Sequence, residues 1–235
     1  MNIAVNIKTL VFFAVSVLQC IHLHSQDTTK TSRIDFDFGM DLKSRYVWRG
    51  SDYGNAPSFQ PYGALVYKNF ELGVWSAFGI TGSFAEKDFY ASYTYKCLKL
   101  TIFDYYLTYS YPAQPGYFNF GKNTPHIIEA DLEFKGQEKF PLQLLGSCNI
   151  YGQDSSWSTY FEAKYTFHLL SSCLDIFAGF TPDRGYYADY EGFVNTGFTA
   201  KKEIKITEKF SLRTNLSVMV NTVSEKVFVV FGLGV

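Results

Sequence analysis

The sequence predicts an all-β protein, an antiparallel transmembrane β-barrel of about twelve strands that follows a cleaved signal peptide. Three observations predict this fold. Apolar and polar side chains alternate with period 2 in one segment after another, and no segment after residue 25 keeps a 3.6-residue period over three turns. Aromatic residues make up 19% of the 235 residues, which suits a wall with apolar side chains on its outside.

The first 25 residues carry the features of a secretory signal. A lysine precedes an apolar run over residues 10–23, and Ser25 supplies a small residue before the expected cleavage. About twenty apolar residues are needed for a membrane-spanning helix, so this run is short for an anchor. An anchor and lipidation at Cys20 are the alternatives. We expect cleavage after Ser25, a short N-terminal lead over residues 26–33 and a barrel over residues 34–235.

Residues 34–48 show the alternation most clearly. Apolar side chains occupy one parity, with Ser44 the one weak member, and charged side chains or glycine occupy the other. Successive Cβ atoms of a strand point to opposite faces, so this pattern predicts one long two-faced strand. Its aromatic residues stand near both ends, as in the girdles of a strand that crosses an outer membrane. They are Phe36 and Phe38 at one end and Tyr46 and Trp48 at the other.

Period 2 predicts the later strands in turn. They are expected at residues 59–68, 70–78, 88–95, 98–109, 128–135, 142–151, 157–167, 174–180, 190–200, 210–220 and 227–235. Pro61 predicts a bulge or a strand end in the first of these. Asp104 falls on the apolar parity of its strand, so we expect a bulge near Phe103 that turns it inward.

The connections between these segments alternate between short turns and longer loops, which is typical of outer-membrane barrels. The last segment keeps its apolar parity as far as Val235, as in the C-terminal strand that the barrel-assembly machinery recognises during biogenesis. A secreted β-sandwich is the alternative fold. It would need a larger aromatic core than two sheets of this size bury, so the barrel is favoured.

Composition and isolated motifs exclude several classes of function. The net charge is −1, so nucleic acid is not expected as a partner. Cys97, Cys148 and Cys173 are an odd set after the signal peptide and match neither a disulfide framework nor a zinc pattern. A lipid-modifying enzyme would need a histidine beside a serine nucleophile, and neither His126 nor His168 finds such a partner by spacing, so we expect no enzyme and no cofactor.

The inward-facing parity predicts a charged lumen. The expected lumen-lining residues are Asp35, Asp37, Asp41, Lys43, Arg45, Glu129, Asp131, Glu133, Glu162, Lys164 and Arg213. Glu129, Asp131 and Glu133 form an acidic stripe, which we interpret as hydrated; metal ligation is the alternative and no metal is expected. Acids and bases of mixed sign predict a narrow lumen with a weak preference for cations.

The longest connection, residues 110–124, is rich in proline and aromatic residues. Long ordered loops are usually functional, so we expect this one to fold back over the mouth as a constriction. Its candidate residues are Tyr111, Tyr117, Phe118 and Phe120. A mobile surface loop is the alternative.

Three stretches resemble the TorF-like porins, a family of outer-membrane proteins of Gram-negative bacteria. They are DLKSRYVWRG at residues 41–50, PSFQP at 57–61 and YKNFELGVW at 67–75; AGFTP at 178–182 and KEIKI at 202–206 resemble versions from Bacteroidetes-type bacteria. The resemblance implies an outer-membrane β-barrel, in contact with membrane lipid, that gives passive diffusion to small solutes or ions. It brings no catalytic residues and leaves the oligomeric state open. Alternatives are a non-conducting barrel whose extracellular loops bind a ligand or partner, and a lipid-modifying enzyme.

The first prediction concerns location. The mature protein should fractionate with outer membranes and migrate faster on a gel when unheated than when boiled, because a closed barrel resists unfolding by detergent. Cell fractionation and paired gel lanes measure both properties. Recovery as a soluble protein from the periplasm or the medium would contradict the barrel.

Overall fold

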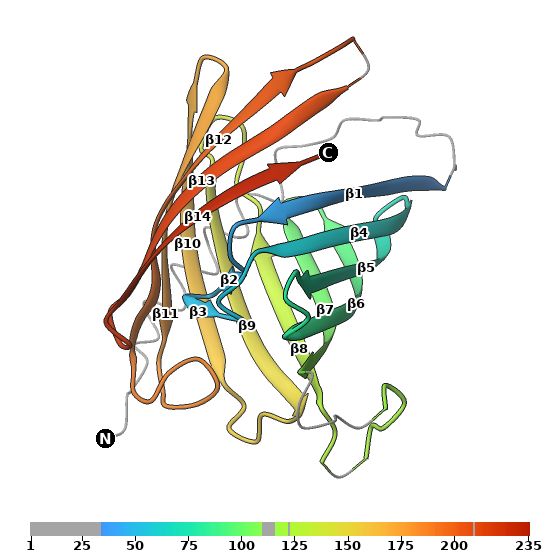
Figure 1. Ribbon diagram of the computed structural model, residues 1–235, viewed down its shortest axis with the longest axis vertical. Helices are drawn as coiled ribbons and strands as arrows, with labels where there is room; N and C mark the ends of the chain where they lie inside the picture. Colours follow the sequence, from blue (N-terminus) through green and yellow to red (C-terminus); the bar gives the residue numbers. More distant parts are fainter. Residues whose placement is uncertain (1–33, 110–115, 122, 209) are drawn as a thin grey trace.

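The computed structural model describes residues 34–109, 116–121, 123–208 and 210–235, so the predicted signal peptide lies outside the described residues. Twelve strands close into one antiparallel barrel, and β1 completes the ring against β14 (Figure 1). The barrel strands are β1 Asp35–Lys43, β4 Ser58–Tyr67, β5 Phe70–Gly79, β6 Phe84–Tyr95, β7 Leu98–Tyr109, β8 His126–Phe134, β9 Leu142–Gly152, β10 Thr159–Leu169, β11 Ser172–Thr181, β12 Gly192–Lys205, β13 Ser211–Asn221 and β14 Lys226–Gly234. The predicted fold class is therefore confirmed.

The two ends of the barrel differ in their connections. At one end, here called the turn end, the strands are joined by residues 68–69, 96–97, 135–141, 170–171 and 206–210. At the other, the loop end, the connections are residues 44–57, 80–83, 110–125, 153–158, 182–191 and 222–225. The first of these contains the short strands β2 Val47–Trp48 and β3 Ser51–Asp52, which pair only with each other. Among the described residues, no helix is long and apolar enough to cross a membrane, a result that does not bear on crossing by strands.

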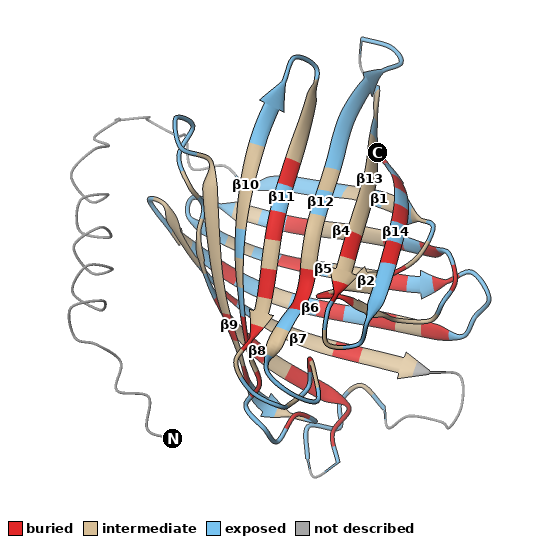
Figure 2. Ribbon diagram, turned by 90° about the vertical axis from the view of Figure 1, so that its left-hand side faces the viewer, coloured by how far each residue is buried: buried red, intermediate tan, exposed pale blue. Residues whose placement is uncertain are grey.

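Large apolar side chains cover the outside of the wall. On β14, Val227, Val229 and Phe231 are 57–65% exposed, whereas Phe228 and Val230 between them are 5% exposed. Figure 2 shows this alternation as bands along the strands. Exposed outward residues on the other strands include Phe36, Phe38, Leu65, Phe70, Leu72, Phe89, Leu100, Ile102, Leu132, Phe161, Ile176 and Phe198. An apolar surface that runs round the whole wall far exceeds what a soluble protein exposes to water, and we call it the apolar belt.

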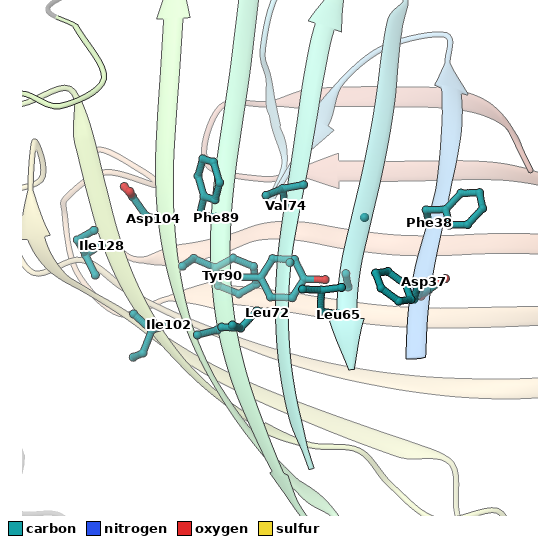
Figure 3. Close-up of a pocket in the computed structure, with 16 residues that line it drawn as sticks. Asp37, Phe38, Leu65, Leu72, Val74, Phe89, Tyr90, Ile102, Asp104 and Ile128 are labelled. Carbon is teal, nitrogen blue, oxygen red and sulfur yellow. The ribbon is translucent and has the colours of Figure 1, made fainter. Parts of the chain in front are cut away.

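The belt is hollowed where small residues replace large ones. A groove of about 700 Å³ runs over the outer face of β4 to β7 (Figure 3). Leu65, Leu72, Val74 and Phe89 line it, and Asp104 stands at one side. Apart from that carboxylate the outward side chains of the groove are apolar, so it continues the belt.

The predicted single strand over residues 34–48 is wrong in its second half. The strand ends at Lys43, and Ser44 then takes over the contact with β14. Its backbone N–H donates to the carbonyl oxygen of Phe231 at 2.8 Å, and its Oγ accepts from the N–H of Phe231 at 2.9 Å. Because this side-chain bond replaces the next ladder bond, the chain leaves the wall and turns inward. Tyr46 is 7% exposed as a result and belongs to no outer girdle, and Trp48 also packs inside the barrel.

The bulge expected near Phe103 is also wrong. β7 pairs with β6 and β8 in one unbroken register, with Asp104 opposite Phe89 and Ile128. Asp104 therefore points outward, where groups from the following loop bind it, as described below. Pro61 likewise lies inside β4, opposite Met40, with no shift of register. The register shifts that the structure does contain lie between β8 and β9 and between β11 and β12.

The closing seam is short. β1 pairs with β4 from Asp35 to Lys43, but with β14 only from Asp41 to Lys43. Arg213 of β13 braces the seam from inside, because its guanidinium donates to the carbonyl oxygen of Val235 at 2.8 Å and lies 3.6 Å from the Asp41 carboxylate. The ladder of backbone hydrogen bonds between β1 and β14 is thus short, and the contacts of Arg213 add to it.

A pair of adjacent residues on β7 tests the two faces of the wall. Leu100 points outward and is 50% exposed, whereas Lys99 points into the lumen. Changing Leu100→Arg should lower the free energy of unfolding by about 1 kcal/mol, because Leu100 lies two residues from the turn end of β7 and a charge on the lipid face costs less near the interface than at the midplane. Urea unfolding in phospholipid vesicles measures this. Lys99→Arg keeps the inward charge and should change it little; equal losses for both variants would refute the assignment of faces.

Candidate functional site in the barrel lumen

The hairpin formed by β2 and β3 carries the central residue of the lumen. Arg49 and Gly50 join the two strands and have positive φ of 48° and 73°, the combination that defines a two-residue type I′ turn. A Cβ on Gly50 would lie 1.7 Å from the carbonyl oxygen of Val194, so only glycine fits there. Asn221 donates from its side chain to the Gly50 carbonyl at 3.1 Å. The hairpin tip is thereby fixed against β12 and β13.

Arg49 is held inside the barrel by acceptors from the wall and from a loop. Its guanidinium makes a two-pronged contact with the Glu129 carboxylate of β8: Nη1 is bonded to Oε2, and Nη2 to Oε1 at 3.1 Å. It also donates to the hydroxyl of Ser147 at 2.8 Å and to that of Tyr187 at 2.6 Å. The Asp131 carboxylate lies 3.7 Å away. Planar, bidentate pairing of this kind is the strongest that a guanidinium makes with a carboxylate.

Aromatic rings enclose the same guanidinium. Its carbon lies 4.5 Å from the ring centre of Trp48, 4.4 Å from that of Tyr160 and 5.2 Å from that of Tyr187. Tyr160 comes from β10 and Tyr187 from the loop between β11 and β12, so the rings connect three separate parts of the chain. A buried cation gains from such faces, because each presents the negative side of its quadrupole.

Glu129 is fully buried and still has every oxygen occupied. Besides Arg49, it accepts hydrogen bonds from the hydroxyl of Tyr105 at 2.8 Å and from that of Tyr187 at 2.5 Å. Burial alone would lower the pKa of Arg49, but the Glu129 carboxylate outweighs burial and holds that pKa well above its usual value. The pair therefore remains charged inside the barrel. We call Trp48, Arg49, Glu129, Tyr160 and Tyr187 the Arg49 layer.

Cavities lie on both sides of this layer. On the side of the loop end, a cavity of about 350 Å³ is bordered by the hairpin, by residues 185–189 and by the turn between β13 and β14. On the side of the turn end, a cavity of about 220 Å³ is lined by charged groups from β7 to β10. These are Lys99, Asp131, Glu133, Glu162 and Lys164. The Arg49 layer adjoins both cavities, because Tyr187 borders the first and Asp131, which faces Arg49, borders the second. The interior is therefore neither an open tube nor a filled core.

The structure distributes the predicted lumen residues over different surroundings. Asp35, Asp37, Asp41, Lys43, Glu129, Asp131, Glu133, Glu162, Lys164 and Arg213 lie at inward positions of their strands. Arg45 does not: it lies in the loop after β1 and forms an ion pair with Asp52 at 3.2 Å. The acidic stripe is divided, because Glu129 and Asp131 face Arg49 whereas Glu133 lines the turn-end cavity.

Sequence reasoning missed Arg49, although it is the best connected charge in the lumen. It lies one residue beyond the segment that was interpreted as a strand, in a stretch noted only for its resemblance. The signal that could have identified it is local: Trp48, Arg49, Gly50 and Ser51 place a glycine second in a two-residue turn between strand-forming residues. Its partners lie about eighty or more residues away and give no signal in the sequence.

The loop expected to narrow the mouth lies on the outside of the wall where the structure describes it. Tyr117 packs on Phe89 and Tyr106, with ring centres 5.6 and 5.1 Å apart, and both rings belong to the outer face. Phe118 is 88% exposed, and Phe120 stacks on His126 at 4.1 Å. These contacts replace the expected constriction, since apolar rings find an apolar surface on the belt. Tyr111 lies outside the described residues.

His126 and Asp104 hold this loop on the wall. Nδ1 of His126 lies 2.6 Å from Oδ1 of Asp104, and Nε2 lies 2.5 Å from the carbonyl oxygen of Tyr117. The Tyr117 hydroxyl donates to the other oxygen of Asp104 at 3.0 Å. Sequence spacing did not reveal this partner for His126, because β7 and β8 bring the two residues together only through their pairing. The described residues contain no group of three or more His, Cys, Asp or Glu that could hold a metal ion.

The fold defines the class of the protein as a closed antiparallel barrel with a side-chain layer across its lumen. A scan against protein-family models finds no match, and a search of curated proteins finds none. Among solved structures, the chain is similar to an outer membrane channel from Pseudomonas putida F1, with 14% identity and a TM-score of 0.44. The similarity covers 89% of this chain and 98% of that one. The resemblance to the TorF-like porins stays a prediction.

Removing the buried cation tests the energetics of the Arg49 layer. Arg49→Met should lower the free energy of unfolding by about 3–5 kcal/mol, because it leaves the Glu129 carboxylate buried without its partner. Adding Glu129→Gln should recover part of the loss, with an interaction energy of about 0.5–3 kcal/mol. Urea unfolding of the four proteins of this cycle measures both values.

Arg45→Met is the matched control, since Arg45 forms its ion pair near the surface and such pairs contribute about 1 kcal/mol or less. If Arg49→Met and Arg45→Met destabilise the barrel equally, the layer is not a stabilising element.

Proposed function

We propose that the protein is an outer-membrane β-barrel of a Gram-negative bacterium that conducts small ions and solutes through a narrow lumen, with the Arg49 layer as its constriction. The observation that carries the proposal is the pair of cavities that adjoin the Arg49 layer. The layer combines Trp48 and Arg49 of the hairpin with side chains of the wall and of a second loop, so we place the constriction where the hairpin meets the wall.

The apolar belt supports the location in a membrane. Leucine, valine and phenylalanine side chains cover the outside of every side of the barrel, and the strands have no unpaired edge except at the short seam. A closed barrel satisfies its backbone hydrogen bonds internally, which is what a segment in hydrocarbon requires. The contrast between an apolar exterior and a charged interior is the inverse of a soluble protein.

Charges on the turn-end side support a hydrated passage with a weak cation preference. The cavity there is lined by the carboxylates of Asp131, Glu133 and Glu162 and by the ammonium groups of Lys99 and Lys164. Lys99 also forms an ion pair with Glu71 at 3.2 Å, which offsets part of the positive charge of Lys99 in this cavity. Carboxylates thus outnumber ammonium groups in this cavity, and rings of acidic groups favour cations.

A second candidate function is a non-conducting barrel that binds a ligand at the loop end. The observation that favours it is the cavity of about 350 Å³ there, which lies within the range of small-molecule sites and is lined by polar groups. Asp52, Tyr186 and Lys226 are among them. In this case the Arg49 layer would be the floor of the binding site.

Currents through planar bilayers test the proposed function. The wild type should show small single-channel currents, and Arg49→Ala should raise the conductance severalfold, because it removes the guanidinium and loosens the contacts of the layer. Reversal potentials in a salt gradient should show weak cation preference. That preference should fall when Glu133 is changed to Gln, a choice that spares Glu129 and also Glu162, which accepts a hydrogen bond from Tyr160 of the layer.

Arg45→Ala is the control, since it changes a charge at the loop end without touching the layer. If neither the wild type nor Arg49→Ala conducts, the channel function is refuted and ligand binding at the loop end takes its place. Anion preference in the wild type would refute the selectivity.

A further inference from the structure

Two carboxylates are buried in the lumen near the loop end without a cation beside them. Glu86 and Asp88 face inward on β6 and are 6% and 4% exposed. Among the described residues, no lysine, arginine or histidine forms an ion pair with either. Lys87 lies between them in sequence but points to the outer face, where its Nζ is 5.7 Å from the ring centre of Tyr106. Buried charge without a partner is strongly destabilising, so this arrangement requires a source of positive charge or a proton.

Hydrogen bonds leave at least one carboxylate oxygen of this pair without a partner among the described residues. The side chain of Tyr46 bonds to Glu86, and the backbone N–H of Tyr106 donates to Oδ1 of Asp88 at 3.4 Å. Oε2 of Glu86 has no partner in the part of the chain that the structure describes. One proton on this pair would neutralise a single carboxylate and leave the other buried without a cation.

A small cavity lies beside Glu86, between the β2–β3 hairpin and the wall. It has about 20 Å³ of room, and about 10–15 Å³ is enough for one particle of the size of water. Potassium and ammonium ions are close to water in size. The polar and aromatic residues that line the cavity are Trp48, Glu86, Tyr105, Asn149, Gln153 and Tyr186.

The lining favours a monovalent cation over a divalent one. Magnesium gives up its water reluctantly and calcium is held by several carboxylates, whereas the described residues contain no cluster of three or more acids, histidines or cysteines that could hold a metal. The cavity instead offers the Glu86 carboxylate, the Gln153 amide and the rings of Trp48 and Tyr105, whose centres lie 5.4 Å apart. The Asn149 amide also lines it and is already bonded to Asp154 and Tyr187. Aromatic faces attract cations that give up water easily.

We propose that the Glu86 cavity binds one monovalent cation of the size of potassium or ammonium. The Glu86 carboxylate supplies the opposite charge, Asp88 adds to the field, and the neighbouring amides and aromatic faces complete the site. The cavity lies next to Trp48 and therefore couples the bound ion to the hairpin that carries Arg49. Binding requires only the cavity, so the proposal does not depend on whether the barrel conducts.

Thermal unfolding of the mature protein in detergent tests this site. The midpoint is measured in choline chloride and then in mixtures in which potassium or ammonium chloride replaces choline at constant ionic strength. Choline carries a trimethylammonium group far larger than the cavity. Potassium and ammonium should raise the midpoint in a saturable way, because they bind the folded state alone. Glu86→Gln should abolish this rise, and Asp88→Asn should move its half-maximal concentration upward.

Glu71→Gln is the matched control, since Glu71 is an inward carboxylate whose oxygens are already bonded to Tyr90 and Lys99. It should keep the full potassium effect. Gln153→Met leaves the carboxylates in place and fills the cavity with an apolar side chain, so it should lose the effect even if Glu86→Gln fails to fold. Identical midpoints in all three salts, or an unchanged effect in Glu86→Gln, would overturn the proposal and leave water or a shared proton in the cavity.

Discussion

The contact between Arg49 and Glu129 organises the lumen of this barrel. It joins a hairpin in the first loop to the middle of β8, eighty residues further along the chain. Both partners are almost completely buried, with 8% of Arg49 and 0% of Glu129 exposed. A bare ion pair at such burial would gain little over its desolvation. Hydroxyl groups from three other residues and three aromatic faces complete its surroundings, which makes the charged form stable there.

The backbone of the hairpin is adapted to that contact. Arg49 has a positive φ, which is uncommon for a residue with a side chain, and residues in such regions persist only when their surroundings impose them. Two contacts fix the turn in this conformation. Asn221 donates a hydrogen bond to Gly50, and the Arg49 guanidinium is bonded to Glu129 of the wall. The hairpin thus behaves as part of the barrel interior, although in sequence it belongs to a loop.

The outer wall shows how a polar group is accommodated on an apolar surface. Asp104 points away from the lumen on a strand whose other outward side chains include Leu100 and Ile102. His126 and the hydroxyl of Tyr117 bind both of its oxygens, and the rings of Phe89 and Tyr106 pack against Tyr117. The loop therefore covers the carboxylate with its own aromatic residues and satisfies its hydrogen bonds from within the protein. This removes the cost that an uncovered carboxylate would have in an apolar environment.

The sequence by itself determined the architecture of the wall. Alternation of side chains depends only on local strand geometry, so the number of strands, their order and the outward face of strands such as β14 could be predicted from single segments. The wrong predictions for Tyr46, Trp48 and Asp104 share one physical cause. Tyr46, Trp48 and Asp104 follow the period of their segments, but where they point was decided by bonds to distant residues: Phe231 for the turn after Lys43, and His126 for Asp104. The Arg49 layer and the Glu86 cavity arise in the same way. Only the closure of the barrel brings β6, β8, β10 and the loop between β11 and β12 round one hairpin, and no local pattern records which charges then meet.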